Sequence, residues 1–177
     1  MKYIRLSWEN IDQQCMKLAK GIKDQKLTFD IILSLSRGGL VPGRLLSDYL
    51  DNNELYTIRV KFYSDIGKRI NRPLITSLTD LDLHGKRILL VDDISDTGES
   101  LIAVLKHLEK MNPDQISVVT LIKKPQSKFT PDFYVEEINA WVIFPWEVKE
   151  TINSIKKKGT DELVKAKISE DELKTLF

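Results

Sequence analysis

The chain has 177 residues and a mass of 20.4 kDa, which suits one domain with a terminal extension. Its 27 Lys and Arg residues nearly balance its 26 Asp and Glu residues, which excludes a nucleic-acid-binding protein driven by bulk positive charge. The single cysteine, Cys15, excludes a disulfide framework within the chain. Because the chain has no long apolar run and no apolar signal region at its start, we expect a soluble cytoplasmic protein with no membrane contact.

Hydrophobic periodicity predicts alternating helices and strands along most of the chain. Ser7 is the expected N-cap of a first helix over residues 8–22, in which Cys15 is a small core residue. The next expected elements are a strand over 30–35, a helix over 40–50, a strand over 55–63, a loop over 64–73, a short strand over 74–76, a turn over 82–86, a strand over 87–91, a helix over 99–111, and strands over 116–122 and 133–135. This alternation favours an α/β domain with a mostly parallel sheet.

The composition changes after Pro145, where the sequence becomes rich in Lys and Glu and poor in Gly. Gly159 divides this part into two expected helices. Ser169 and Glu172 have the spacing of a capping box at the start of the last one.

The most informative segment runs from Val91 to Ser100, where an apolar strand ends in two aspartates and a small-residue turn follows. Open α/β sheets bind ligands at this end of their strands. Asp92 and Asp93 can accept hydrogen bonds from sugar hydroxyls or hold Mg²⁺, and the hydroxyls and N–H groups of the following helix start suit a phosphate. The segment predicts a ribose 5-phosphate site. The alternative is a carboxylate-rich turn that only caps a helix.

A second loop, Ser36-Arg37-Gly38-Gly39, also follows a buried strand. Two glycines let the backbone present N–H groups, and arginine adds a permanent cation with bidentate geometry. A diphosphate is the natural ligand of this pair, although such a sequence also occurs in ordinary turns. Lys68 and Arg69 lie in a basic segment whose composition alone favours a solvated connection.

The sequence also offers groups that could contact a purine base. Lys124 at a strand end can donate to an exocyclic carbonyl, and an aromatic side chain can stack on a purine face. Tryptophans are more often core residues, and Trp146 is expected to pack.

These motifs resemble those of a known family. Val91 to Ser100 resembles the phosphoribosyl-diphosphate (PRPP) signature of type I phosphoribosyltransferases, and Ser34 to Gly43 resembles the diphosphate loop of the xanthine-guanine (6-oxopurine) members. The resemblance covers residues 1–148 and implies the type I phosphoribosyltransferase fold, with a mostly parallel central sheet flanked by helices and a small base-recognition hood. Residues 149–177 would then be a C-terminal helical extension. The resemblance also implies a non-proline cis peptide before Arg37.

The resemblance gives each matching residue an expected role. Asp92 and Asp93 would bind the ribose hydroxyls and the metal, Mg²⁺, while Asp96 would act as the catalytic acid or base at N7 of the purine. The expected 5-phosphate residues are Asp96, Thr97, Gly98, Glu99 and Ser100; the expected diphosphate residues are Ser36, Arg37, Gly38, Lys68 and Arg69; the expected base residues are Lys124, Trp141, Val142 and Glu147. Glu147 stands where the family has Asp.

The implied activity is purine salvage. A 6-oxopurine (guanine, xanthine or hypoxanthine) and PRPP would give the nucleoside 5′-monophosphate and diphosphate, in a homodimer or homotetramer that binds no nucleic acid. One alternative is a phosphoribosyltransferase for adenine or a pyrimidine. Another is a PRPP- or nucleotide-sensing regulator without turnover, against which the presence of Arg37, Arg69, Lys124 and Trp141 argues.

Overall fold

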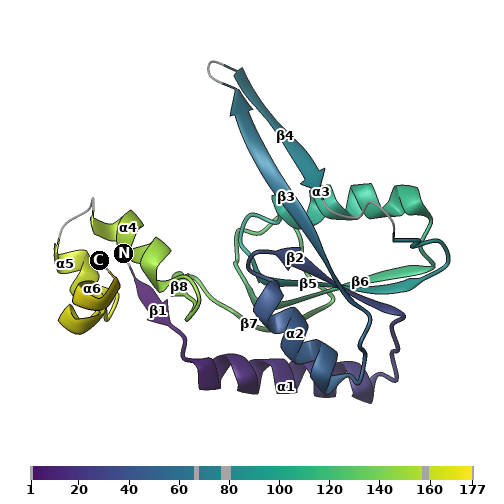
Figure 1. Cartoon of the computed structure of the whole chain (residues 1–177), viewed down its shortest axis with the longest axis horizontal. Helices are drawn as coiled ribbons and strands as arrows, with labels where there is room; N and C mark the ends of the chain where they lie inside the picture. Colours follow the sequence, from purple (N-terminus) through teal and green to yellow (C-terminus); the bar gives the residue numbers. More distant parts are fainter. Residues whose placement is uncertain (1, 66–67, 77–80, 157–159, 177) are drawn as a thin grey trace. The chain divides into compact units, whose positions relative to one another are not determined.

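The chain forms two compact units (Figure 1). The structure, a computed structural model, describes residues 2–65, 68–76, 81–156 and 160–176, of which 62–65, 68–73, 156, 160–161 and 170 are described by their backbone alone. The larger unit comprises residues 12–137, and the smaller comprises residues 1–11 and 138–177. Helix α1 (Trp8–Asp24) begins in the smaller unit and continues into the larger. The functional division expected at residue 148 stays a prediction.

A six-stranded sheet forms the centre of the larger unit, in the order β4-β3-β2-β5-β6-β7. Its strands are β2 (Ile31–Ser36), β3 (Leu55–Asp65), β4 (Lys68–Thr76), β5 (Arg87–Ser95), β6 (Gln115–Lys123) and β7 (Phe133–Glu137). All neighbouring strands in this sheet run parallel except β3 and β4, which are antiparallel. The expected α/β fold with a mostly parallel sheet is therefore confirmed.

Helices cover both faces of this sheet (Figure 1). On one face lies α3 (Glu99–Leu108), which ends in a 3₁₀ turn, η1 (Glu109–Met111). On the other lie α2 (Leu40–Tyr49) and the adjoining part of α1, where Tyr49 donates a hydrogen bond to Asp12. Alternate residues of β2 point to opposite faces. A shared buried cluster on the α3 side includes Ile31, Leu33 and Leu35 of β2 with Leu101, Val104 and Leu108 of α3. Burial on both faces explains why the strands appear in the sequence as continuous apolar runs.

The segment 64–73 was expected to be a loop, and that expectation is wrong for most of it. Strands β3 and β4 form a hairpin whose pairing runs from Arg59 opposite Thr76 to Asp65 opposite Lys68. Figure 1 shows both strands running past the rest of the sheet. Backbone hydrogen bonds hold such a hairpin whatever its side chains are, so no apolar alternation marks it in the sequence. The connection at 66–67 and the side chains of Lys68 and Arg69 lie outside the described residues.

The smaller unit pairs the two ends of the chain. Strand β1 (Tyr3–Arg5) runs parallel to β8 (Trp141–Ile143), and neither was expected, since three residues show no period. Three helices follow instead of two: α4 (Val148–Lys156), α5 (Thr160–Lys165) and α6 (Glu170–Leu176). Among the described residues, no helix is long and apolar enough to cross a membrane.

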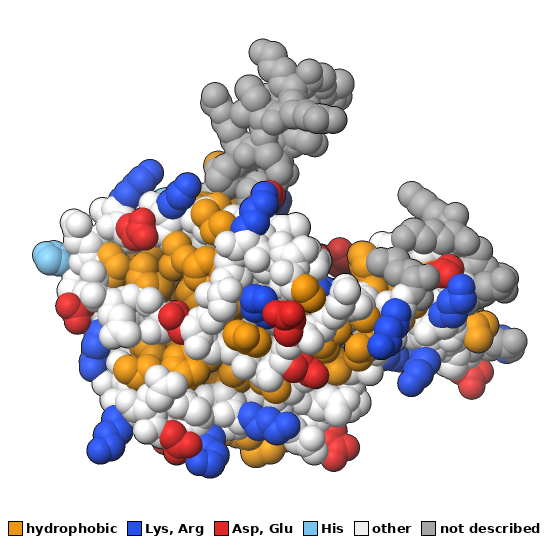
Figure 2. Space-filling view, turned by 180° about the vertical axis from the view of Figure 1, so that it is seen from behind, with side chains coloured by type: hydrophobic (Ala, Val, Ile, Leu, Met, Phe, Trp, Pro, Cys, Tyr) orange, Lys and Arg blue, Asp and Glu red, His pale blue; other side chains and the backbone are white. Residues whose placement is uncertain are grey.

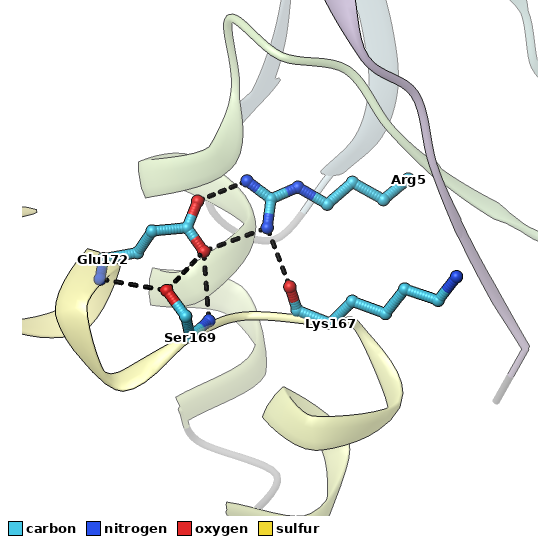
Figure 3. Close-up of polar contacts among 4 residues, drawn as sticks. All are labelled: Arg5, Lys167, Ser169 and Glu172. Atoms are coloured by element: carbon cyan, nitrogen blue, oxygen red, sulfur yellow. Dashed lines mark hydrogen bonds and ion pairs between the residues drawn. The ribbon is translucent and has the colours of Figure 1, made fainter.

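Three local predictions are confirmed. The N–H of Asn10 donates to Ser7 Oγ (3.1 Å), so Ser7 caps α1. The N–H of Glu172 donates to Ser169 Oγ (3.2 Å) and the N–H of Ser169 donates to Glu172 Oε2 (3.0 Å), which completes the capping box (Figure 3). Cys15 has no exposed surface, and burial raises the pKa of its thiol to about 12.

Candidate active site

The expected PRPP loops leave the sheet at one edge. Strands β2 and β5 are parallel neighbours, with Ser34 opposite Val91, so their carboxyl ends meet. Strand β3, which follows β2 in the chain, pairs with β2 on the side away from β5. The strand order therefore reverses between β2 and β5. Ligands of open α/β sheets bind at such a reversal.

The two loops are in close contact. A Cβ added at Gly38 would lie 2.3 Å from Asp93 Oδ2, and one added at Gly39 would lie 2.2 Å from the Val91 carbonyl oxygen. Glycine is therefore required at both positions for the loops to approach this closely. Arg37 is exposed beside them, and the Ser36–Arg37 peptide is cis, as the resemblance implied. The structure thus brings the expected diphosphate loop and the expected ribose carboxylates together.

The acidic pair is electrostatically strained. Burial raises the pKa of Asp92 well above its ordinary value, and the neighbouring Asp93 carboxylate raises it further. The N–H of Asp93 donates to Asp92 Oδ1 (3.0 Å) and partly offsets this. A bound cation, or hydroxyl donors from a sugar, would relieve the repulsion, and two hard carboxylates fit Mg²⁺. In the part of the chain that the structure describes, no group of three or more His, Cys, Asp or Glu could hold a metal ion by itself.

The turn from Asp96 to Ser100 leads into the N-terminus of α3. Gly98 has a φ of +78°, in the left-handed region, and a Cβ there would lie 2.8 Å from Phe129. The Glu99 carboxylate pairs with Lys128 Nζ (3.0 Å), and the backbone N–H of Glu99 donates to Thr97 Oγ1 (3.3 Å). A helix N-terminus with adjacent hydroxyls favours a phosphate. Thr97 and Ser100 supply those hydroxyls.

The segment after β6, of which the sequence analysis singled out only Lys124, braces this turn. The residues from Lys124 to Phe129 follow β6, which pairs with β5 and ends beside it. The hydrogen bonds that connect them include Lys124 N–H to Ser95 O (2.9 Å), Gln126 Nε2 to Asp96 Oδ1 (3.0 Å) and Lys128 N–H to Thr97 O (3.0 Å). Gln126 carried no motif, and the neighbouring ends of β5 and β6 are the signal that could have found it.

The structure also brings Lys124 close to Asp96. Lys124 is 8% exposed, and burial lowers its pKa while the Asp96 carboxylate opposes that change. Asp96 itself is exposed to solvent. A buried donor beside an accessible carboxylate can bind a neutral acceptor and accept a proton within one site.

Three expected base residues belong to the smaller unit. Trp141 is 40% exposed at the start of β8, whereas Val142 is buried. The Glu147 carboxylate accepts a hydrogen bond from the N–H of Phe144 (3.4 Å). Trp146 packs as expected, with its ring stacked on Phe144 at 4.9 Å. The roles of Trp141, Val142 and Glu147 stay predictions.

Comparison with known proteins identifies the family. The sequence matches the phosphoribosyl transferase domain over residues 6–152. The chain belongs to this family. A purine phosphoribosyltransferase from Pyrococcus horikoshii is 37% identical, with a TM-score of 0.74 over 82% of this chain and 94% of that one. A xanthine-guanine-hypoxanthine phosphoribosyltransferase from Helicobacter pylori is 28% identical, with a TM-score of 0.73 over 88% of this chain and 99% of that one.

As a phosphoribosyltransferase, the chain is an enzyme, and the family match covers both loops and the segment that braces them. It also covers β8. The match ends within α4, so α5 and α6 lie beyond it.

Proposed function

We propose that this phosphoribosyltransferase converts a 6-oxopurine (guanine, xanthine or hypoxanthine) and PRPP to the nucleoside 5′-monophosphate and diphosphate. The largely buried Lys124 side chain, close to Asp96, is the observation that carries this proposal. A buried donor stabilises a 6-oxo group, which accepts a hydrogen bond. It disfavours adenine, whose 6-amino group cannot accept that bond. The relatives named for purine substrates support the acceptor class.

The proposed reaction is a displacement at C1 of the ribose. A purine nitrogen attacks that carbon as diphosphate leaves, and the carbon inverts. Arg37 and the N–H groups of its loop would stabilise the charge of the leaving diphosphate, with Lys68 and Arg69 as further candidates. Mg²⁺, bound at Asp92 and Asp93, would supply additional neutralisation of that charge.

Asp96 would accept the proton from N7 of the purine. Its Oδ1 accepts a hydrogen bond from Gln126, and its exposure leaves the carboxylate open to an incoming base. Thr97, Gly98, Glu99 and Ser100 would bind the 5-phosphate at the start of α3. Trp141 and Val142 would contact the base, and Glu147 its 2-position.

The partners follow from this proposal: PRPP and a purine as substrates, and the nucleotide and diphosphate as products. Basic and acidic side chains are interspersed on the face shown in Figure 2, which does not favour nucleic acid. The resemblance adds a homodimer or homotetramer, which sedimentation equilibrium would test. The cytoplasmic location expected from the sequence stays a prediction.

The test is diphosphate release from PRPP and Mg²⁺ with guanine, xanthine, hypoxanthine, adenine, uracil and orotate in separate reactions. Release with 6-oxopurines alone is expected. Release with adenine or a pyrimidine would retain the PRPP site and overturn the role of Lys124. Tight PRPP binding without release with any base would move the protein to the class of regulators.

A further inference from the structure

The strand that carries Trp141 and Val142 is short and has little support of its own. Strand β8 has three residues and forms a two-stranded sheet with β1. An isolated two-stranded ribbon is at best marginally stable in water. The orientation of Trp141 therefore depends on the elements that pack against this pair of strands.

The C-terminal helices provide that packing. Ile143, the last residue of β8, has no exposed surface. It joins a buried cluster with Ile152, Ile155, Leu163, Ala166 and Ile168, against which Tyr3 of β1 also packs. Side chains two residues apart share one side of a strand, so fixing Ile143 also orients Trp141.

Polar contacts connect β1 to the same helices. Tyr3 and Arg5 of β1 lie opposite Trp141 and Ile143 of β8. Tyr3 Oη donates to Glu162 Oε2 (2.8 Å), just inside α5. Tyr3 and Arg5 are both attached to the part of the chain after residue 160, Tyr3 through Glu162 and Arg5 through Lys167 and Glu172.

The Arg5 contact is the stronger of the two (Figure 3). Arg5 Nη1 donates to Lys167 O (2.7 Å) and to Glu172 Oε2 (3.0 Å), and its Nη2 forms an ion pair with Glu172 Oε1. The two side chains are 26% and 31% exposed, so the pair is partly shielded from water. The capping box at Ser169 holds the same carboxylate, which fixes Glu172 at the start of α6. A bidentate pair held in this way gives direction as well as attraction.

We propose that the C-terminal helices position the base-binding strand, so that Arg5 and Glu172 are positioning residues for purine recognition. The inference rests on the proposed function, because it takes Trp141 as a base contact. The helices α5 and α6 lie beyond the residues that the family model matches. The PRPP loops are braced within the larger unit, by the segment from Lys124 to Phe129. Loosening α6 should therefore weaken purine binding and leave PRPP binding unchanged.

The variant Glu172→Gln tests this on the full-length enzyme. Glutamine retains the capping box at this position while removing the charge that pairs with Arg5. We expect the KM for guanine to rise about tenfold, as for a misplaced binding group, with the KM for PRPP within about twofold of wild type. Asp24→Asn, which removes an exposed ion pair to Lys20 in the larger unit, is the matched control and should change neither constant.

A double-mutant cycle with Trp141→Ala separates positioning from simple stability. If Glu172 acts through the tryptophan, Glu172→Gln should have no further effect on the KM for guanine once Trp141 is truncated. Additive effects would overturn the inference, as would an equal rise in both KM values or a lower Tm with both KM values unchanged.

The wild-type reaction distinguishes failure of the proposed function from failure of the positioning role of the C-terminal helices. A wild-type chain that released no diphosphate with any base would overturn the function and this inference together. Wild-type release with an unchanged Glu172→Gln variant would overturn this inference alone.

Discussion

The contact between Gly38 and Asp93 makes a quantitative prediction. In Gly38→Ala the new methyl group would lie 2.3 Å from Asp93 Oδ2, whereas an ordinary contact begins near 3.4 Å. The carboxylate must therefore move by about 1 Å, at a cost of about 1–3 kcal/mol for an overpacked site. A displacement of that size in a binding group can reduce its effect by up to about a hundredfold. We expect the dissociation constant of PRPP to rise between about tenfold and a hundredfold while the fold is kept.

Two further glycine variants provide comparisons for Gly38→Ala. In Gly39→Ala the methyl group would meet the Val91 carbonyl at 2.2 Å, and because backbone cannot rotate away, the damage should fall on stability. A loss of about 3 kcal/mol corresponds to a fall in Tm of about 6–12 °C for a domain of this size. Gly21→Ala, in α1 with no atom within 4 Å of the new group, is the control and should stabilise by about 1 kcal/mol.

Isothermal titration with PRPP and Mg²⁺, together with thermal unfolding, measures both quantities. Gly38→Ala should lose affinity with a small change in Tm, and Gly39→Ala should lose Tm. Unchanged PRPP affinity in Gly38→Ala would refute the assignment of Asp93 to the PRPP site.

The remaining predictions concern protons and burial. Asp96→Asn should lower kcat by about 10²–10⁴-fold with little change in PRPP affinity, and intact turnover would remove its proton role. Lys124→Ala should impair 6-oxopurines selectively, so an equal loss for adenine would contradict base recognition. Arg5 lowers the pKa of Glu172 to about 2, below the unfolded value of about 4.3. The ion pair therefore stabilises the folded chain fully above about pH 4.3, and this stabilisation is lost as the pH falls toward 2. In acid titrations, the difference in stability between wild type and Glu172→Gln should vanish near pH 2. Cys15, with a thiol pKa of about 12, should resist iodoacetamide at pH 8 until the chain unfolds, and rapid native labelling would contradict its burial.

The central strands and the two loops were predictable because burial on both faces leaves an unmistakable apolar run. Strand β2 is buried along almost its whole length, and β5 is fully buried from Ile88 to Val91, although it continues through the aspartates to Ser95. The sequence also marks Gly38 and Gly39, since close backbone approach requires residues without a side chain.

The parts that could not be predicted depend on contacts distant in sequence. Strands β1 and β8 are three residues each and exist because they pair across the chain. Strands over 55–63 and 74–76 were expected, but the part of the β3–β4 hairpin within residues 64–73 is held by backbone pairing under a polar sequence. Gln126 reaches Asp96 because β5 and β6 end together, which no local pattern shows.

The pairing of β1 with β8 also orders events during synthesis. Tyr3 leaves the ribosome long before its partner Trp141, and at about 5–20 residues per second the delay is about 7–28 s. Every strand of the six-stranded sheet is complete by residue 137, so the strands of the larger unit are all made before β8. The contacts of the smaller unit are complete only once α6 has been made, because Arg5 of β1 pairs with Glu172 of α6. A chain whose synthesis paused after residue 137 would therefore contain every strand of the larger unit and a first strand without its partner β8.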